Sequence, residues 1–66
     1  MKLKGWLTRD EDGTLGFYYN NKPIRVDGSW INGCFWMVLV DEISDGFPEI
    51  TWESDPVEVE LEIRKI

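Results

Sequence analysis

The sequence predicts an all-β fold, either a small curled antiparallel sheet or a barrel-like sandwich of about five to six short strands. In several segments apolar and polar residues alternate, which is the period of an extended strand. Clusters of Gly, Asn, Asp and Pro separate these segments at close spacing, as turns between short strands do. We allow one helical turn near residues 41–45. With 66 residues, the chain is expected to form a single domain, residues 1–66.

Residues 34–40 form the segment around which the predicted fold is organised. They are seven consecutive apolar residues between an Asn-Gly and an Asp-Glu pair. In a strand both faces of this segment would be apolar, so both must be covered by a curled sheet, a second layer or a partner. A buried helix is the competing interpretation. Seven residues are short for one, and the aromatic and β-branched residues favour a strand.

A hairpin is expected at the start of the chain. Residues 2–8 alternate like a strand with one solvated face, and residues 14–19 form its return strand. Between them, residues 10–13 supply a turn that ends in a glycine able to take the left-handed conformation. The return strand must end before Pro23, because proline cannot donate to a central ladder.

Short strands are expected in the middle of the chain. Residues 24–26 are too short for more than an edge strand, and an Asp-Gly turn connects them to residues 29–31. An Asn-Gly dipeptide at residues 32–33 suits the type I′ turn of a hairpin. We therefore expect residues 30–31 to pair with residues 34–35.

Two further strands are expected in the last third of the chain, at residues 47–53 and 57–64. The second alternates through its whole length, so three glutamates share its solvent face: Glu58, Glu60 and Glu62. Like charges in one row repel each other unless an opposite row lies beside them. Lys2 and Lys4 form such a row, so we expect the first and last strands to be neighbours, with lysines facing glutamates.

The composition limits both stabilisation and partners. One cysteine and no histidine leave no intrachain disulfide, so the core must depend on three Phe, two Tyr and four Trp, and dimerisation remains open. Without a signal pattern or an apolar run of about 18 residues, we expect a soluble cytoplasmic protein. Thirteen acidic against seven basic residues give a net charge of −6, which disfavours direct binding to nucleic acids or membranes.

Four segments carry a resemblance to known sequences: residues 6–15, residues 22–23, residues 47–53 and residues 58–61. In these segments the chain resembles small uncharacterised proteins encoded by bacteriophages and mobile elements of gut bacteria. The resemblance covers both ends of the chain and leaves residues 24–46 mostly unmatched. It implies a phage-like or prophage-like origin and no particular activity.

The residue types argue against catalysis, cofactors and metals. Nucleophilic catalysis needs a titratable base beside the nucleophile, and Cys34 has no candidate partner in a chain without histidine. The acidic residues 10–12 and the glycine after them invite comparison with a calcium loop, but Thr14 stands where that loop needs an acid. Structural zinc is excluded by the number of ligands. We expect a non-enzyme without cofactor or metal.

Six residues are the candidates for partner binding: Trp6, Tyr18, Glu49, Glu53, Glu58 and Glu60. Trp6 and Tyr18 are expected on neighbouring strands of the first hairpin, exposed on its solvent face, where aromatic side chains anchor partners. The alternative is that both rings cover the sheet or stabilise it as a cross-strand pair. The four glutamates would form an acidic rim, or alternatively only a solvated face.

The leading hypothesis is a small acidic non-catalytic interaction protein, which in a phage context would inhibit a host defence or regulatory protein with a basic surface. A second hypothesis is a small-ligand or nucleotide sponge with an aromatic cleft lined by Trp30, Trp36 and Trp52. Its cationic contacts would come from Arg9, Lys22 and Arg25. A third is a structural component that oligomerises through the apolar segment.

Overall fold

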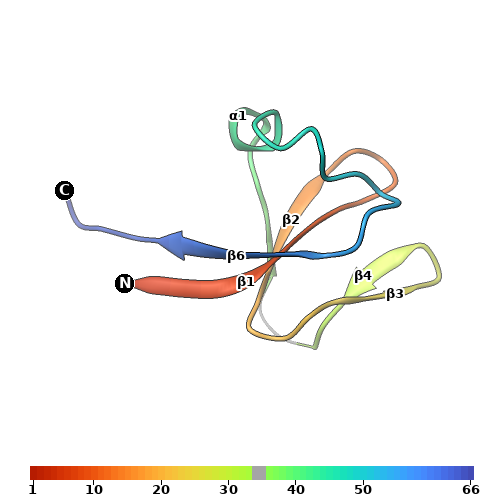
Figure 1. The fold of residues 1–66 in the computed structure, drawn as a ribbon, viewed down its shortest axis with the longest axis horizontal. Coiled ribbons are helices and arrows are strands. Elements are labelled where there is room, and N and C mark those ends of the chain that lie inside the picture. Colours follow the sequence, from red (N-terminus) through yellow and green to blue (C-terminus); the bar gives the residue numbers. More distant parts are fainter. Residues whose placement is uncertain (34–35) are drawn as a thin grey trace.

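The computed structural model describes residues 1–33 and 36–66, which form six strands and one short helix (Figure 1). The elements are β1 (Lys2–Arg9), β2 (Leu15–Tyr19), β3 (Ile24–Val26), β4 (Ser29–Ile31), β5 (Trp36–Val38), α1 (Asp41–Ser44) and β6 (Val57–Glu62). Four strands form an antiparallel sheet in the order β5-β2-β1-β6, and β3 and β4 form a separate antiparallel hairpin. The all-β prediction, with one helical turn near residues 41–45, is confirmed.

The first hairpin forms as the sequence predicts. β1 and β2 pair from Gly5 opposite Tyr19 to Arg9 opposite Leu15. The amide of Gly13 donates to the carbonyl of Asp10 at 2.9 Å, and Gly13 has the positive φ of 96° that this turn needs. The chain thus reverses by a local turn that depends on a single glycine.

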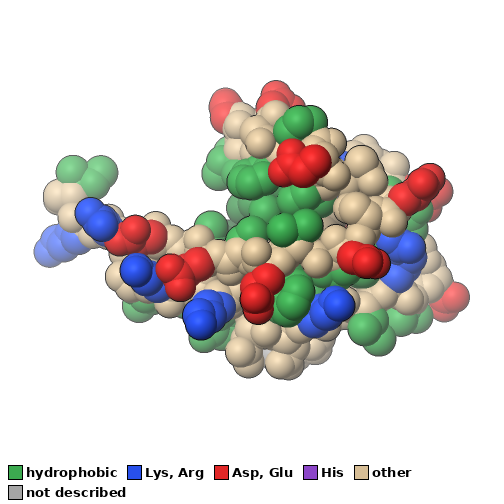
Figure 2. All heavy atoms as spheres, viewed as in Figure 1, with side chains coloured by type: hydrophobic (Ala, Val, Ile, Leu, Met, Phe, Trp, Pro, Cys, Tyr) green, Lys and Arg blue, Asp and Glu red, His purple; other side chains and the backbone are tan. Residues whose placement is uncertain are grey.

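The predicted pairing of the two ends of the chain is also confirmed. In the β1–β6 ladder Lys2 lies opposite Glu62 and Lys4 opposite Glu60, and the Nζ of Lys2 is 3.8 Å from the Oε1 of Glu60. Figure 2 shows basic and acidic side chains next to each other along this ribbon. Beyond the strands, Met1 and Ile63 exchange two backbone hydrogen bonds of 2.9 and 2.7 Å. The lysines of β1 and the glutamates of β6 therefore face each other within one ladder of the sheet.

The core lies on one face of the sheet, where Leu7, Leu15, Phe17 and Ile50 are almost fully buried. The ring of Phe17 crosses the backbone at Gly5, where an added Cβ would come within 2.4 Å of its Cζ atom. The segment that contains α1 and Ile50 covers this face (Figure 1). The core is therefore covered on this side by a helical turn and loops, without a second sheet.

The predicted strand at residues 47–53 is wrong. The segment forms consecutive turns, with the amide of Ile50 donating to the carbonyl of Phe47 at 3.1 Å. A strand here would need its backbone groups for a ladder, but two of its carbonyls, those of Phe47 and Ile50, accept hydrogen bonds from Arg9. Ile50 enters the core from a turn instead of from a strand.

Within the chain, the described part of residues 34–40 is covered on one face only, and the predicted covering of the other face by a partner stays a prediction. Met37 and Leu39 pack against the core, but Trp36, Val38 and Val40 are 55%, 55% and 60% exposed. β5 is an edge strand of the four-stranded sheet, and no other described element packs over this face of it. With β5 and β6 as its two edges, the four-stranded sheet stays open across the described residues and does not close into a barrel.

The β3–β4 hairpin forms a small second layer on the opposite face. Ile24 pairs with Ile31, and the connecting Asp27 and Gly28 both have positive φ, of 48° and 79°. The predicted pairing of residues 30–31 with Cys34 and Phe35 falls on two positions outside the described residues. Among the described residues, β4 pairs with β3 alone.

The side chain of Arg9 connects the end of β1 to the segment that covers the core. Its Nε donates to the carbonyl of Ile50 at 2.6 Å, and its Nη1 donates to Gly13 at 2.9 Å and to the hydroxyl of Ser44 at 2.6 Å. Its Nη2 donates to the carbonyls of Ser44 at 3.2 Å and Phe47 at 2.9 Å. All these acceptors are neutral, so the guanidinium acts here through its number of donors and their planar geometry.

We expect Arg9→Lys to lower the free energy of unfolding by at least about 2 kcal/mol, because one ammonium cannot reach acceptors that the guanidinium contacts on three nitrogens. Urea denaturation measures the loss. Arg64→Lys is the control, since Arg64 is exposed and bonded only to nearby Glu62 among the described residues. Equal unfolding midpoints for the two variants would contradict the role given to Arg9.

Reversing one charge of the β1–β6 ladder should destabilise the protein modestly. In Lys2→Glu a carboxylate faces Glu62 and adjoins Glu60, so we expect a loss of about 0.2–1 kcal/mol that shrinks at high salt. Lys65→Glu makes the same change of net charge beyond the end of β6. Thermal unfolding of both variants at low and high salt provides the measurement, and identical shifts would refute a specific ladder effect.

Candidate functional site

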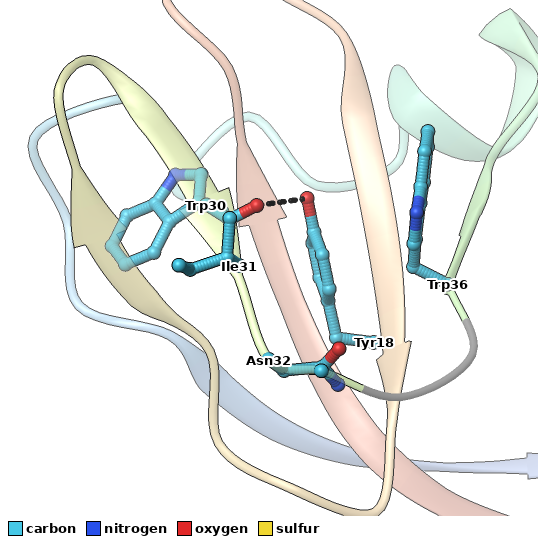
Figure 3. A pocket seen from close by; sticks show the side chains of 6 residues that line it. Tyr18, Trp30, Ile31, Asn32 and Trp36 are labelled. Carbon is cyan, nitrogen blue, oxygen red and sulfur yellow. Dashed lines mark hydrogen bonds between the residues drawn. The ribbon is translucent and has the colours of Figure 1, made fainter.

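A hollow of about 370 Å³ lies on the outer face of β2, between the end of β4 and the start of β5 (Figure 3). We call it the aromatic hollow. Aromatic side chains and the turn after β4 line it: Tyr18, Trp30, Ile31, Asn32, Gly33 and Trp36. Its volume is at the lower end of the range for sites that bind small molecules or single side chains.

The strand register brings the two main rings of the aromatic hollow together. Tyr18 of β2 lies opposite Trp36 of β5, and their rings stack with centroids 6.1 Å apart and planes inclined by 21°. The hydroxyl of Tyr18 donates to the carbonyl of Trp30 at 3.3 Å, as Figure 3 shows. The polar tip of Tyr18 is therefore occupied within the protein.

The third aromatic residue is fixed by β1. The indole Nε1 of Trp30 donates to the carbonyl of Arg9 at 3.1 Å, and Trp30 is only 7% exposed. After β4, Gly33 takes a positive φ of 72°, which favours glycine at this position. The amide of Asn32 donates to the carbonyls of Tyr19 and Asn21, at 3.2 Å each, and so holds this turn against the end of β2.

Among the described residues, no charged side chain lines the aromatic hollow. The carboxylate of Asp10, however, affects the hydroxyl of Tyr18 at its floor. Burial raises the pKa of Tyr18, and the negative charge of Asp10 raises it further. Burial also raises the pKa of Asp10 itself, with a second contribution from Asp12. Both shifts reflect a partly buried environment in which the hydroxyl of Tyr18 lies near the carboxylate of Asp10.

The two predicted aromatic anchors have different environments. Trp6 and Tyr18 lie opposite each other in the β1–β2 ladder, as expected. Tyr18 is only 6% exposed, however, so its predicted exposure is wrong; β4 packs over it. Trp6 is half-buried, with its Nε1 donating to Asn20 at 3.3 Å and the Nζ of Lys22 5.6 Å from its ring centroid.

The four candidate glutamates are exposed, and none lines the described wall of the aromatic hollow. Glu58 and Glu60 lie on β6, opposite Trp6 and Lys4 of β1. The other two, Glu49 and Glu53, lie in the turns before β6. Their predicted part in partner binding stays a prediction.

The predicted cleft of three tryptophans is divided in the structure. Trp30 and Trp36 line the aromatic hollow, whereas Trp52 packs edge-on against Trp30 at a centroid distance of 6.0 Å. Arg25 lies over both of these rings, 4.6 Å from the centroid of Trp30 and 4.7 Å from that of Trp52, and donates to the carbonyl of Trp52. The cluster of Trp30 and Trp52 is therefore already occupied by the guanidinium of Arg25.

Sequence reasoning missed the residues that complete the aromatic hollow, Ile31, Asn32 and Gly33. Their signal was present in the Asn-Gly dipeptide, which was interpreted as the turn of a hairpin. Asn32 follows the end of β4, and its side-chain amide donates to the carbonyl of Tyr19 at the end of β2. The predicted hairpin with Cys34 and Phe35 stays a prediction.

Neither metal ligands nor known relatives identify the site. In residues 1–33 and 36–66, no three acidic or cysteine side chains are grouped so that they could hold a metal ion. No helix in the same residues is long and apolar enough to cross a membrane. Comparison with protein-family models, curated proteins and solved structures finds no match to this chain. The site must be interpreted from its own chemistry.

The raised pKa of Tyr18 predicts a loss of stability at alkaline pH. Because the folded pKa lies above the ordinary value of 10.0, the stabilising contribution of neutral Tyr18 is fully present below about pH 10 and is lost as the pH rises through the folded pKa. We expect Tyr18→Phe to remove this part of the loss. Urea unfolding at about pH 8 and about pH 11 measures it.

Tyr19→Phe is the matched control, because it removes one hydroxyl from the neighbouring, exposed tyrosine. This variant is expected to retain the alkaline loss that Tyr18 causes. If wild type and Tyr18→Phe lost the same stability between the two pH values, the environment assigned to Tyr18 would be wrong.

Proposed function

We propose that this chain is a non-catalytic interaction protein that binds a protein partner through the aromatic hollow and the outer face of β5. The observation that carries the proposal is the exposure of Trp36 and Val38, 55% each, directly beside a hollow with a tyrosine floor. A large aromatic side chain at the rim of a preformed hollow is typical of the centre of a protein interface.

The exposed apolar surface extends beyond the aromatic hollow. Val40 is 60% and Ile43 45% exposed, and Ile31 is half exposed on the other side of the hollow. Burying one large apolar side chain is worth about 1.5–3 kcal/mol, which a partner that covers this surface would gain. Exposed apolar side chains beside a preformed hollow are typical of interaction sites.

A protein partner fits the aromatic hollow better than an enclosed small ligand does. Ligand sites enclose most of their ligand, whereas Ile31 and Trp36 leave this hollow open to solvent. The cations proposed for an anionic ligand are engaged elsewhere: Arg9 with backbone carbonyls, Arg25 with two tryptophans and Lys22 with Trp6. The nucleotide alternative is therefore disfavoured.

The charge of the chain supports a basic partner over a second copy of itself. A net charge of −6 opposes self-association and steers a positively charged surface toward the protein. In the phage context that the sequence suggests, such a partner would be a host protein. We retain the inhibition of a host protein as part of this proposal.

Photo-crosslinking from defined positions tests the proposal. We would introduce a benzophenone amino acid at Val38, in the proposed surface, and at the equally exposed Ile63, at the far end of the β1–β6 ribbon, and expose both proteins to a gut-bacterial lysate. A specific product is expected from position 38 and not from position 63. Excess wild-type protein should compete it away.

With the captured partner purified, Trp36→Ser should weaken binding at least about tenfold, while Ile63→Ser should leave it unchanged. Titration calorimetry measures both affinities. Equal crosslinking from the two positions, or equal affinities of the two variants, would contradict the proposed surface.

A further inference from the structure

The tryptophans of this protein are cation-binding groups with one exception. The ammonium of Lys22 lies over the ring of Trp6, and the guanidinium of Arg25 lies over the rings of Trp30 and Trp52. Trp36 is the most exposed large ring in the hollow, and no cation lies over it among the described residues. It stacks on Tyr18 instead, which leaves one indole face toward solvent.

We propose that the exposed indole face of Trp36, at the rim of the aromatic hollow, binds the guanidinium of an arginine side chain presented by the protein partner. This inference rests on the proposed function and names the chemical group that the binding surface recognises. Aromatic faces attract cations through the ring quadrupole, and a flat guanidinium stacks on them better than an ammonium does.

The clamp around Arg25 shows that the chain already forms this type of site. There, one guanidinium lies 4.6 and 4.7 Å from two indole centroids and donates to a backbone carbonyl. The aromatic hollow likewise has an exposed indole, that of Trp36, at its rim.

The charges around the aromatic hollow favour a cation. Its described wall has no charged side chain that would repel one, and the carboxylate of Asp10 acts electrostatically on the hydroxyl of Tyr18. The chain as a whole carries −6, so a basic group is drawn to it from a distance. An apolar occupant would use the rings equally well but would gain nothing from these charges.

A comparison of two probes of equal shape tests the inference. N-acetyl-arginine methylamide and its neutral counterpart N-acetyl-citrulline methylamide would each be titrated into the ¹⁵N-labelled protein, with the four indole Nε1–H resonances observed by NMR. We expect a saturable shift at Trp36 with the arginine probe and binding at least about fivefold weaker with the citrulline probe. Sodium chloride at matched ionic strength controls for screening.

Variants separate cation recognition from apolar contact. Trp36→Leu retains an apolar side chain but removes the ring, so arginine binding, followed at the resonances of the residues around the hollow, should be lost. Ile63→Ser should bind the probe as wild type does. Thermal unfolding checks that Trp36→Leu is folded, which is expected because Trp36 is more than half exposed.

The outcomes for this inference and for the proposed function are distinguishable. Equal binding of the arginine and citrulline probes, or no saturable shift at Trp36, would overturn the guanidinium site. The proposed function would stand if crosslinking at position 38 persisted in that case. A shift confined to Trp6, Trp30 or Trp52 would mean that the probe displaces an internal cation, and would also overturn the assignment to Trp36.

Discussion

The structure depends on one guanidinium. Arg9 ends β1, and its side chain gathers the carbonyls of Ser44, Phe47 and Ile50 together with that of Gly13 in the first turn. These bonds keep the segment after α1 over the core, where a chain without disulfides has little else to hold it. The backbone carbonyl of the same residue receives the indole of Trp30. One residue thus positions the covering layers on both faces of the sheet.

The aromatic hollow follows from the way the β3–β4 hairpin covers only part of the outer face of the sheet. The β3–β4 hairpin covers Tyr18 and supplies Trp30, but β5 extends past it along the edge of the sheet. Trp36 therefore stacks on the ring of Tyr18, is 55% exposed and has no described layer above it. The space beside Tyr18 therefore stays open among the described residues, which supports the proposed binding surface.

The features that sequence reasoning predicted are those set by nearby residues or by a clear pattern of charge. Gly13 identifies the first turn from its own position in the sequence. The lysines of β1 indicate the pairing with the glutamates of β6, although the two strands lie at opposite ends of the sequence. Residues 47–53 were misassigned because Ile50 and Trp52 alternate like a strand, while the deciding contact comes from Arg9, 41 positions before Ile50. The burial of Tyr18 depends on a second layer that its own strand cannot reveal.

The two edges of the sheet are protected very differently, and this contrast supports a binding role for β5. At the β6 edge, alternate positions carry glutamates, which discourage pairing with other strands. At the β5 edge the exposed positions are Trp36 and Val38, side chains that invite association. A protein that needed only to stay apart from others would gain from charges at both edges. One edge is charged, the other is apolar, and the whole chain is acidic, which supports the proposal of a partner that combines an apolar contact with positive charge.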